Sequence, residues 1–135
     1  MKFLTALILV VPLAACGARS SDVEQVRALV AELEIAAEER DASDVLALIS
    51  ANYEDAQGFD RAQLQNFLRG YFLAHPKIEL LVGIDNLQFP ADGLAQAEIT
   101  VTNVSLNDPE RERLKVEFRR EGDEWRVSRA DRLAR

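Results

Sequence analysis

The side chains of this chain that could take part in acid–base or nucleophilic chemistry include one histidine, one cysteine and two tyrosines. His75 could serve as a general acid or base, because imidazole titrates near neutral pH. It directly precedes Pro76, which disfavours the helical region for the residue before it, so His75 should end a helix. A histidine at that position commonly bonds the last carbonyl groups. We favour this structural role for His75.

Sequence motifs for catalysis are absent. No His, Cys or Glu cluster has the spacing of metal ligands, and there is neither a glycine-rich phosphate loop nor a G-x-S-x-G elbow. Most zinc and nucleophilic mechanisms are therefore disfavoured. We expect no metal and no cofactor, and we assign no catalytic residue.

Two polar residues follow an apolar strand face. The alternation that begins at Ala97 places Asn103 and Ser105 on the inner face if the strand stays regular. A bulge would instead bring Val104 and Leu106 inward, and burying each of these is worth roughly 1.5 to 3 kcal/mol. We therefore favour the bulge, which sends Asn103 and Ser105 to solvent.

The N-terminal segment indicates export. Lys2 is followed by an apolar run over residues 3–15, which is too short to span a bilayer and fits a cleaved signal peptide. Leu13-Ala14-Ala15-Cys16 resembles the lipobox of bacterial lipoproteins, in which the cysteine receives a diacylglycerol before cleavage. Lipidation also accounts for a lone cysteine in an exported protein. We expect Cys16 to hold the mature chain on a membrane through its lipid.

The residue after Cys16 bears on the location of the protein. In the lipoproteins that this segment resembles, an aspartate there favours the inner membrane, whereas this chain has Gly17. The resemblance therefore implies a bacterial envelope protein on the outer membrane, facing the periplasm. A net charge of −7 argues against nucleic acid as a partner.

The mature chain should form one domain. Residues 16–21 read as a lipidated cysteine with a short polar tether, and residues 22–135 have the length of a single α+β domain. Ser21 and Glu24 have capping-box spacing for a first helix that ends near Arg40. Asp41 should cap a second helix over residues 42–50.

A third helix should begin after Asp60, with Gln63 completing a capping box, and end at His75. Its apolar stripe is predicted to dock on the sheet, and consists of Leu64, Phe67, Leu68, Tyr71 and Phe72. From residue 78 onward the apolar period becomes two, which predicts four antiparallel strands with a bulge near Asp85-Asn86 and a hairpin turn at Glu121-Gly122-Asp123.

This order of elements resembles the nuclear transport factor 2-like superfamily, which includes ketosteroid isomerases and the SnoaL-like polyketide cyclases. The resemblance rests on a long first helix, a short apolar second helix and a segment at residues 53–58 before the third helix. A late strand at residues 97–101 and the closing segment at residues 122–127 complete it. It implies a cone of three N-terminal helices packed on a curved, mainly antiparallel sheet.

Such a cone often holds a small apolar ligand at its wide end. The residues that could supply polar groups there are Tyr53, Tyr71, His75, Asn103 and Ser105. Tyr53 could equally pack as an edge aromatic. The isomerase chemistry of this superfamily needs a carboxylate base and a tyrosine or protonated acid. Tyr53, Tyr71, Asp55 and Asp85 have these types, but we transfer no catalytic role to them.

Three hypotheses follow from the sequence. The favoured one is a non-enzymatic domain that binds a small apolar ligand or an envelope protein partner. The second is an assembly module, such as a homodimer formed through the sheet face. The third and weakest is a lyase or isomerase. An apolar cavity would support the first, whereas an exposed apolar sheet face would support the second.

Overall fold

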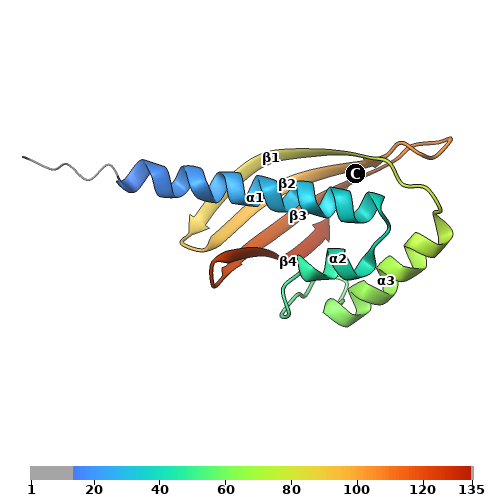
Figure 1. The fold of residues 1–135 in the computed structure, drawn as a ribbon, viewed down its shortest axis with the longest axis horizontal. Coiled ribbons are helices and arrows are strands. Elements are labelled where there is room, and N and C mark those ends of the chain that lie inside the picture. Colours follow the sequence, from blue (N-terminus) through green and yellow to red (C-terminus); the bar gives the residue numbers. More distant parts are fainter. Residues whose placement is uncertain (1–13, 135) are drawn as a thin grey trace, which may run out of the picture.

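The computed structural model describes the backbone of residues 14–134 and the side chains of residues 20–134. Most of the expected signal peptide and the side chain of Cys16 lie outside the described residues. The described part of the chain forms three helices followed by four strands (Figure 1). These elements are α1 (Ala14–Glu38), α2 (Ala42–Ala47), α3 (Arg61–Ala74), β1 (Leu80–Ala91), β2 (Leu94–Asn103), β3 (Glu110–Glu121) and β4 (Glu124–Arg132).

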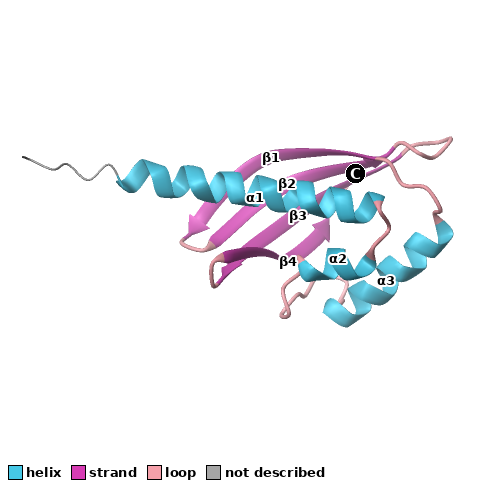
Figure 2. Cartoon of the chain, in the orientation of Figure 1, coloured by secondary structure: helices cyan, strands magenta, loops and turns pink. Residues whose placement is uncertain are grey.

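The strands form one antiparallel sheet in the order β1-β2-β3-β4, and α1 crosses one face of it (Figure 2). The α+β class and the four-strand meander are therefore as predicted. The predicted bulge is also confirmed, because the register shifts between Asp85 and Gln88 and Asn86 has a φ of 53°. Gly122, with a φ of 64°, lies in the turn between β3 and β4, where left-handed backbone favours glycine.

The predicted start of the first helix is wrong. Helix α1 begins at Ala14, and Ser21 lies inside it, where its hydroxyl accepts a hydrogen bond from Gln25 Nε2 at 3.1 Å. The helix thus continues through the segment expected as a tether. Alanines at positions 14, 15 and 18 favour helix, and Gly17 alone costs only about 1 kcal/mol relative to alanine.

The other two helices begin where expected. The Asp41 carboxylate accepts a hydrogen bond from the backbone of Asp44, and Asp60 and Gln63 form a reciprocal capping box. Helix α2 ends at Ala47 rather than at residue 50. The chain leaves the helix there because Ile49 forms a parallel bridge with Val127 of β4.

The core lies between α1 and the sheet. Val26 of α1, Ala95 of β2 and Phe118 of β3 are fully buried. Among the side chains that the structure describes, Val26 is the first along the chain to belong to the core. Among the described residues, no helix has the length and apolar character needed to cross a membrane.

The predicted docking of α3 on the sheet is wrong. Helix α1 already covers the sheet, and α3 packs beside α2 at the rim of the molecule (Figure 1). Only Phe72 of its apolar stripe is buried, whereas Phe67 is 46% exposed. The remaining stripe residues, Leu64, Leu68 and Tyr71, are half-buried.

Candidate functional site

An apolar cleft of about 250 Å³ lies between the helices and the sheet face that they cover. Four side chains of α1 reach it at helical spacing, at positions 30, 33, 34 and 37. The opposite wall is formed by inward-facing strand residues. The lining residues that bear most on the function are Val30, Leu33, Glu34, Tyr53, Leu64, Leu68, Val82, Val101 and Ala130.

Among the described residues that line this cleft, only Glu34 and Tyr53 have side chains with polar atoms. The other lining side chains are aliphatic, apart from Phe118. Small-ligand sites generally combine a mostly apolar wall with a few polar groups. The cleft therefore has the composition of a site for an apolar molecule.

The hydroxyl of Tyr53 is already committed. It donates to Asp55 Oδ2 at 2.7 Å, and the Tyr53 side chain is only 4% exposed. Burial raises the pKa of Tyr53 well above its ordinary value, and the hydrogen bond and negative charge of Asp55 raise it further. The ring of Tyr53 therefore forms part of the cleft wall. Its hydroxyl proton is bonded to Asp55 and is not free to stabilise an enolate oxygen.

The segment that holds Tyr53 is fixed to β4. Asp55 Oδ1 accepts backbone hydrogen bonds from Gln57 at 3.0 Å and from Phe59 at 3.1 Å. Asp131 of β4 accepts one from Ala56 at 2.7 Å. Burial alone would raise the pKa of Asp131, but this hydrogen bond and the Arg129 guanidinium outweigh it, so the pKa lies below its usual value. This wall of the cleft is thus held in place.

Four of the five predicted pocket residues meet elsewhere, in what we call the Asn103 cluster (Tyr71, His75, Asn103 and Ser105). Asn103 Nδ2 donates to the Tyr71 hydroxyl at 3.2 Å, and Asn103 Oδ1 accepts from Ser105 Oγ at 2.6 Å. The rings of Tyr71 and His75 stack with centroids 4.0 Å apart, and His75 Nδ1 lies 2.9 Å from the Tyr71 carbonyl oxygen. This cluster joins the end of α3 to the end of β2.

The favoured bulge after Val101 is therefore wrong. Asn103 is only 4% exposed, whereas Val104 is 38% exposed. With Val104 exposed, the free energy that its burial would contribute is not gained. Burying Asn103 instead costs little, because the hydrogen bonds of its amide are made. Tyr71 and Ser105 make those bonds for Asn103.

The predicted pocket thus divides into two parts. Tyr53 lines the cleft, while the residues of the Asn103 cluster are not among the cleft's lining residues. The position of His75 agrees with its structural role, because its backbone N–H also bonds the Tyr71 carbonyl oxygen at 3.0 Å. The Asn103 cluster is a structural joint, and its polar groups largely satisfy one another.

Glu34 is the residue that sequence reasoning missed. Its signal is the spacing itself, because Val30, Glu34 and Ala37 lie on the same face of α1. The neighbouring Ile35 points away and is 56% exposed. An acid on the inner face beside an aliphatic residue on the outer face reverses the pattern expected for a surface helix.

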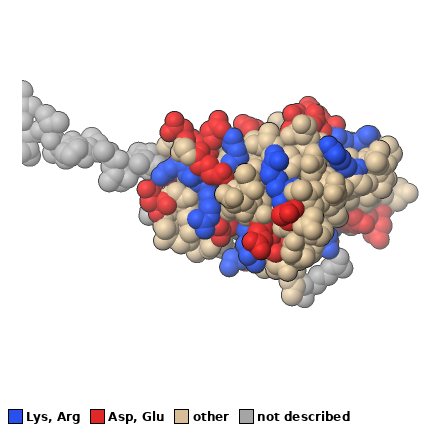
Figure 3. All heavy atoms as spheres, turned by 90° about the horizontal axis from the view of Figure 1, so that it is seen from below, with Lys and Arg blue, Asp and Glu red and all other residues tan. Residues whose placement is uncertain are grey.

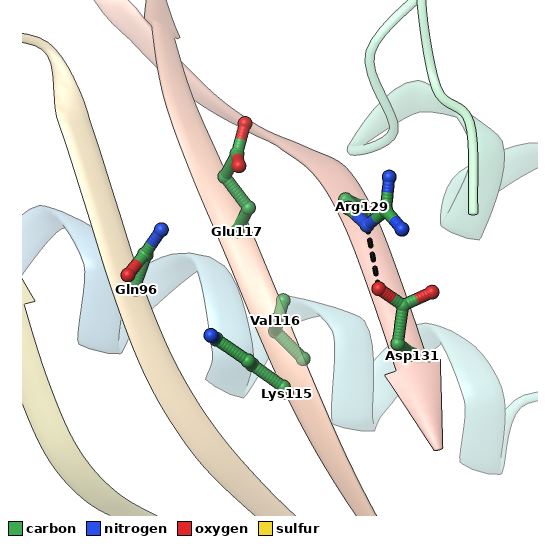
Figure 4. Close-up of a pocket in the computed structure, with 6 residues that line it drawn as sticks. All are labelled: Gln96, Lys115, Val116, Glu117, Arg129 and Asp131. Atoms are coloured by element: carbon green, nitrogen blue, oxygen red, sulfur yellow. Dashed lines mark hydrogen bonds and ion pairs between the residues drawn. The ribbon is translucent and has the colours of Figure 1, made fainter. Parts of the chain in front are cut away.

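A second hollow, also of about 250 Å³, lies on β2, β3 and β4 and has a polar lining (Figure 4). Its charged groups are largely paired with one another, as in the contact of 2.5 Å between Arg129 Nε and Asp131 Oδ2. Glu117 accepts from Arg119 at 2.9 Å and from Ser128 at 3.0 Å. A charged ligand would have to displace these partners, so the apolar cleft is the better candidate site.

Charges on the face shown in Figure 3 are interspersed, with basic and acidic side chains side by side. No group of three or more His, Cys, Asp or Glu side chains in the described part of the chain is arranged to hold a metal ion. The chemistry available in the cleft is therefore apolar contact together with the carboxylate of Glu34.

Comparisons with known proteins identify the fold alone. No family profile matches the chain, and no curated protein matches it significantly. Solved structures do match. A provisionally named scytalone dehydratase from Novosphingobium aromaticivorans superposes with a TM-score of 0.72 at 10% identity, covering 88% of this chain and 89% of that one.

Two further structures name the fold directly. A provisionally named dehydratase of the nuclear transport factor 2-like family from Streptomyces avermitilis has a TM-score of 0.70 at 15% identity, over 85% of this chain and 99% of that one. A nuclear transport factor 2-like protein of unknown function from Shewanella oneidensis has a TM-score of 0.67 at 14% identity, over 82% and 98%. The chain therefore has the nuclear transport factor 2-like fold that its sequence resembles.

Proposed function

We propose that this chain is an envelope lipoprotein, tethered through Cys16, whose mature domain binds a small apolar ligand without converting it. The observation that carries the binding proposal is the cleft of about 250 Å³ with its almost wholly apolar lining. Burying apolar surface in such a cleft contributes roughly 25 cal/mol per Å². The tethering rests on the lipobox-like segment before Cys16.

Two names among the structural neighbours point to dehydration, but the cleft supports binding better. Chemistry on a carbonyl compound needs a base and a group that stabilises the developing negative charge. Glu34 could supply the base. The Tyr53 hydroxyl donates to Asp55, so the second group is not available among the residues that line the cleft.

Assembly through an apolar sheet face is also less well supported. Glu98, Lys115 and Glu117 alternate with buried residues along β2 and β3, so they lie on the side of the sheet away from the helices. A sheet face that carries these side chains is polar, whereas obligate dimer interfaces are more hydrophobic than ordinary surface.

A neutral environment-sensitive dye tests the binding proposal. The protein used is the mature chain, residues 16–135 with Cys16→Ser, which keeps every core residue in the described part of the chain. We expect Leu68→Gln to weaken dye binding about tenfold, because a leucine contact in the cleft is lost. Leu73→Gln is the matched control on the same helix, since Leu73 is 85% exposed.

The outcome of this titration decides the proposal. Saturable binding that Leu68→Gln weakens and Leu73→Gln leaves unchanged supports ligand binding in the cleft. Absence of saturable binding by the parent chain, or equal effects of the two substitutions, contradicts it.

A further inference from the structure

Glu34 occupies a position where an apolar side chain would be expected. It faces the cleft together with Val30, Leu33 and Ala37, while Ile35 is exposed on the other side of the helix. Local reversals of the apolar pattern concentrate at functional sites, because they cost stability without improving the core. The position of Glu34 therefore calls for a functional explanation.

The carboxylate of Glu34 has no hydrogen-bond or ion-pair partner among the described residues. Glu38, one helical turn further along α1, differs in this respect, because its Oε2 accepts a hydrogen bond from the backbone of Leu80 at 3.2 Å. Glu38 thus has a structural role at the start of β1. Glu34 is half-buried at the cleft and remains available to a ligand.

The cleft offers nothing to an anionic group. Within residues 20–134, the lining includes no Lys, Arg or His, and the Tyr53 hydroxyl donates its hydrogen bond to Asp55. A carboxylate or phosphate group would therefore meet Glu34 without any cation to compensate for the repulsion. A wholly neutral ligand that covered Glu34 would also be disfavoured, because desolvating an unpaired charge costs free energy.

The charge of the residues around the cleft favours a cationic ligand. Residues 22–60, which supply α2 and the part of α1 from Asp22 onward, contain eleven acids and two basic residues, Arg27 and Arg40. A surface of this sign raises the local concentration of cations and speeds their association. The net charge of −7 and the single carboxylate in the cleft thus favour the same kind of ligand, one that carries positive charge.

We propose that the ligand of the cleft is a cationic amphiphile, with its apolar chain among the aliphatic side chains and its ammonium-type head group paired with Glu34. This inference rests on the proposed function, because it names the class of molecule that the same cleft binds. It adds that the head group, and not only the apolar chain, determines the affinity.

Three decyl compounds that differ only in the head group separate the two claims. Decyltrimethylammonium is the cation, decanoate the anion and decanol the neutral reference, and each is used below its micelle concentration to displace the neutral dye. We expect the cation to displace dye at the lowest concentration. Glu34→Gln should weaken cation binding about fivefold and leave decanol binding unchanged or stronger.

Glu32→Gln is the matched control. It removes the same charge two residues away, and Glu32 borders a different surface hollow with Ile35. It should leave the order of the three compounds unchanged. Urea unfolding followed by the fluorescence of Trp125, the only tryptophan, verifies that each variant is folded.

The outcomes are distinguishable. Equal displacement by the three compounds, or a cation affinity that Glu34→Gln leaves unchanged, overturns the cationic ligand while apolar binding stands. Displacement chiefly by decanoate also overturns it. Failure of the parent chain to bind dye or any decyl compound overturns the proposed function as well.

Discussion

Tyr53 makes the stability of the protein depend on pH in the alkaline range. Burial and the carboxylate of Asp55 hold the pKa of its phenol above the ordinary value of 10.0. The folded chain therefore keeps the proton at a pH where the unfolded chain loses it. The contribution of the neutral phenol is complete below pH 10.0 and is lost as the pH rises above it.

We expect the free energy of unfolding of the parent chain to fall faster above pH 10 than that of Tyr53→Phe. The excess slope should approach about 1.4 kcal/mol per pH unit, which corresponds to one proton. Urea unfolding of both chains between pH 8 and pH 11, monitored through Trp125, measures it. Parallel curves for the two chains would show that Tyr53 ionises equally easily in both states.

Single residues were only partly predictable from the sequence. Tyr53 is a candidate pocket residue by sequence, with packing as an edge aromatic as the alternative, and its ring lines the cleft. Asn103 was placed in solvent because apolar burial was weighed without knowledge of Tyr71, which arrives from another element and satisfies the amide. Glu34 could not be identified from the sequence, because its role depends on which side of α1 lines the cleft. The periodicity of the sequence does not show where a cleft lies.

Helix α3 illustrates the limits at the scale of elements. Its start at Asp60 and its end at His75 follow from local rules of capping and proline geometry, and both were predicted. Its docking depends on which surface α1 and α2 leave uncovered. The apolar stripe therefore predicted the inward face of α3, but not that this helix packs beside α2 and meets the sheet at the end of β2.

The two phenylalanines of α3 should differ in their contribution to stability. Phe72→Ala should cost about 3 to 5 kcal/mol, because Phe72 is only 6% exposed. Phe67→Ala should cost less than about 1.5 kcal/mol, since Phe67 is 46% exposed. Its ring lies beside Phe59 and Tyr71, with centroids 6.3 Å and 6.2 Å away.

Urea unfolding of the two variants measures this difference. Both substitutions replace phenylalanine with alanine in the same helix, so the change in helix propensity is the same for both. Equal losses of stability, or a larger loss for Phe67→Ala, would mean that the Phe67 side of α3 packs against something that covers it.

For the whole molecule, the fold could be identified from patterning, whereas the proposed membrane attachment rests on the sequence alone. Alternation over four strands and the three helical stripes were sufficient for the α+β class.

In a diderm bacterial host, labelled palmitate should enter the parent chain and not Cys16→Ser, because Cys16 is the only thiol. Ser21→Ala is the control and should retain the label. Equal labelling of the parent chain and Cys16→Ser would contradict lipid attachment at Cys16.

The continuity of α1 has a consequence for how a ligand arrives. A helix rises 1.5 Å per residue, so Glu34 lies about 27 Å along the helix axis from Cys16. The end of the domain where α1 starts carries the β1–β2 and β3–β4 turns (Figure 1). Asp92 of the first turn pairs with Arg120, and the second turn carries the acids Glu121 and Asp123. These acids do not favour lying flat on anionic lipid. A lipid on Cys16 would then hold the cleft away from the bilayer surface. The ligand of the cleft would be exchanged with the surrounding water instead of being taken directly from the bilayer.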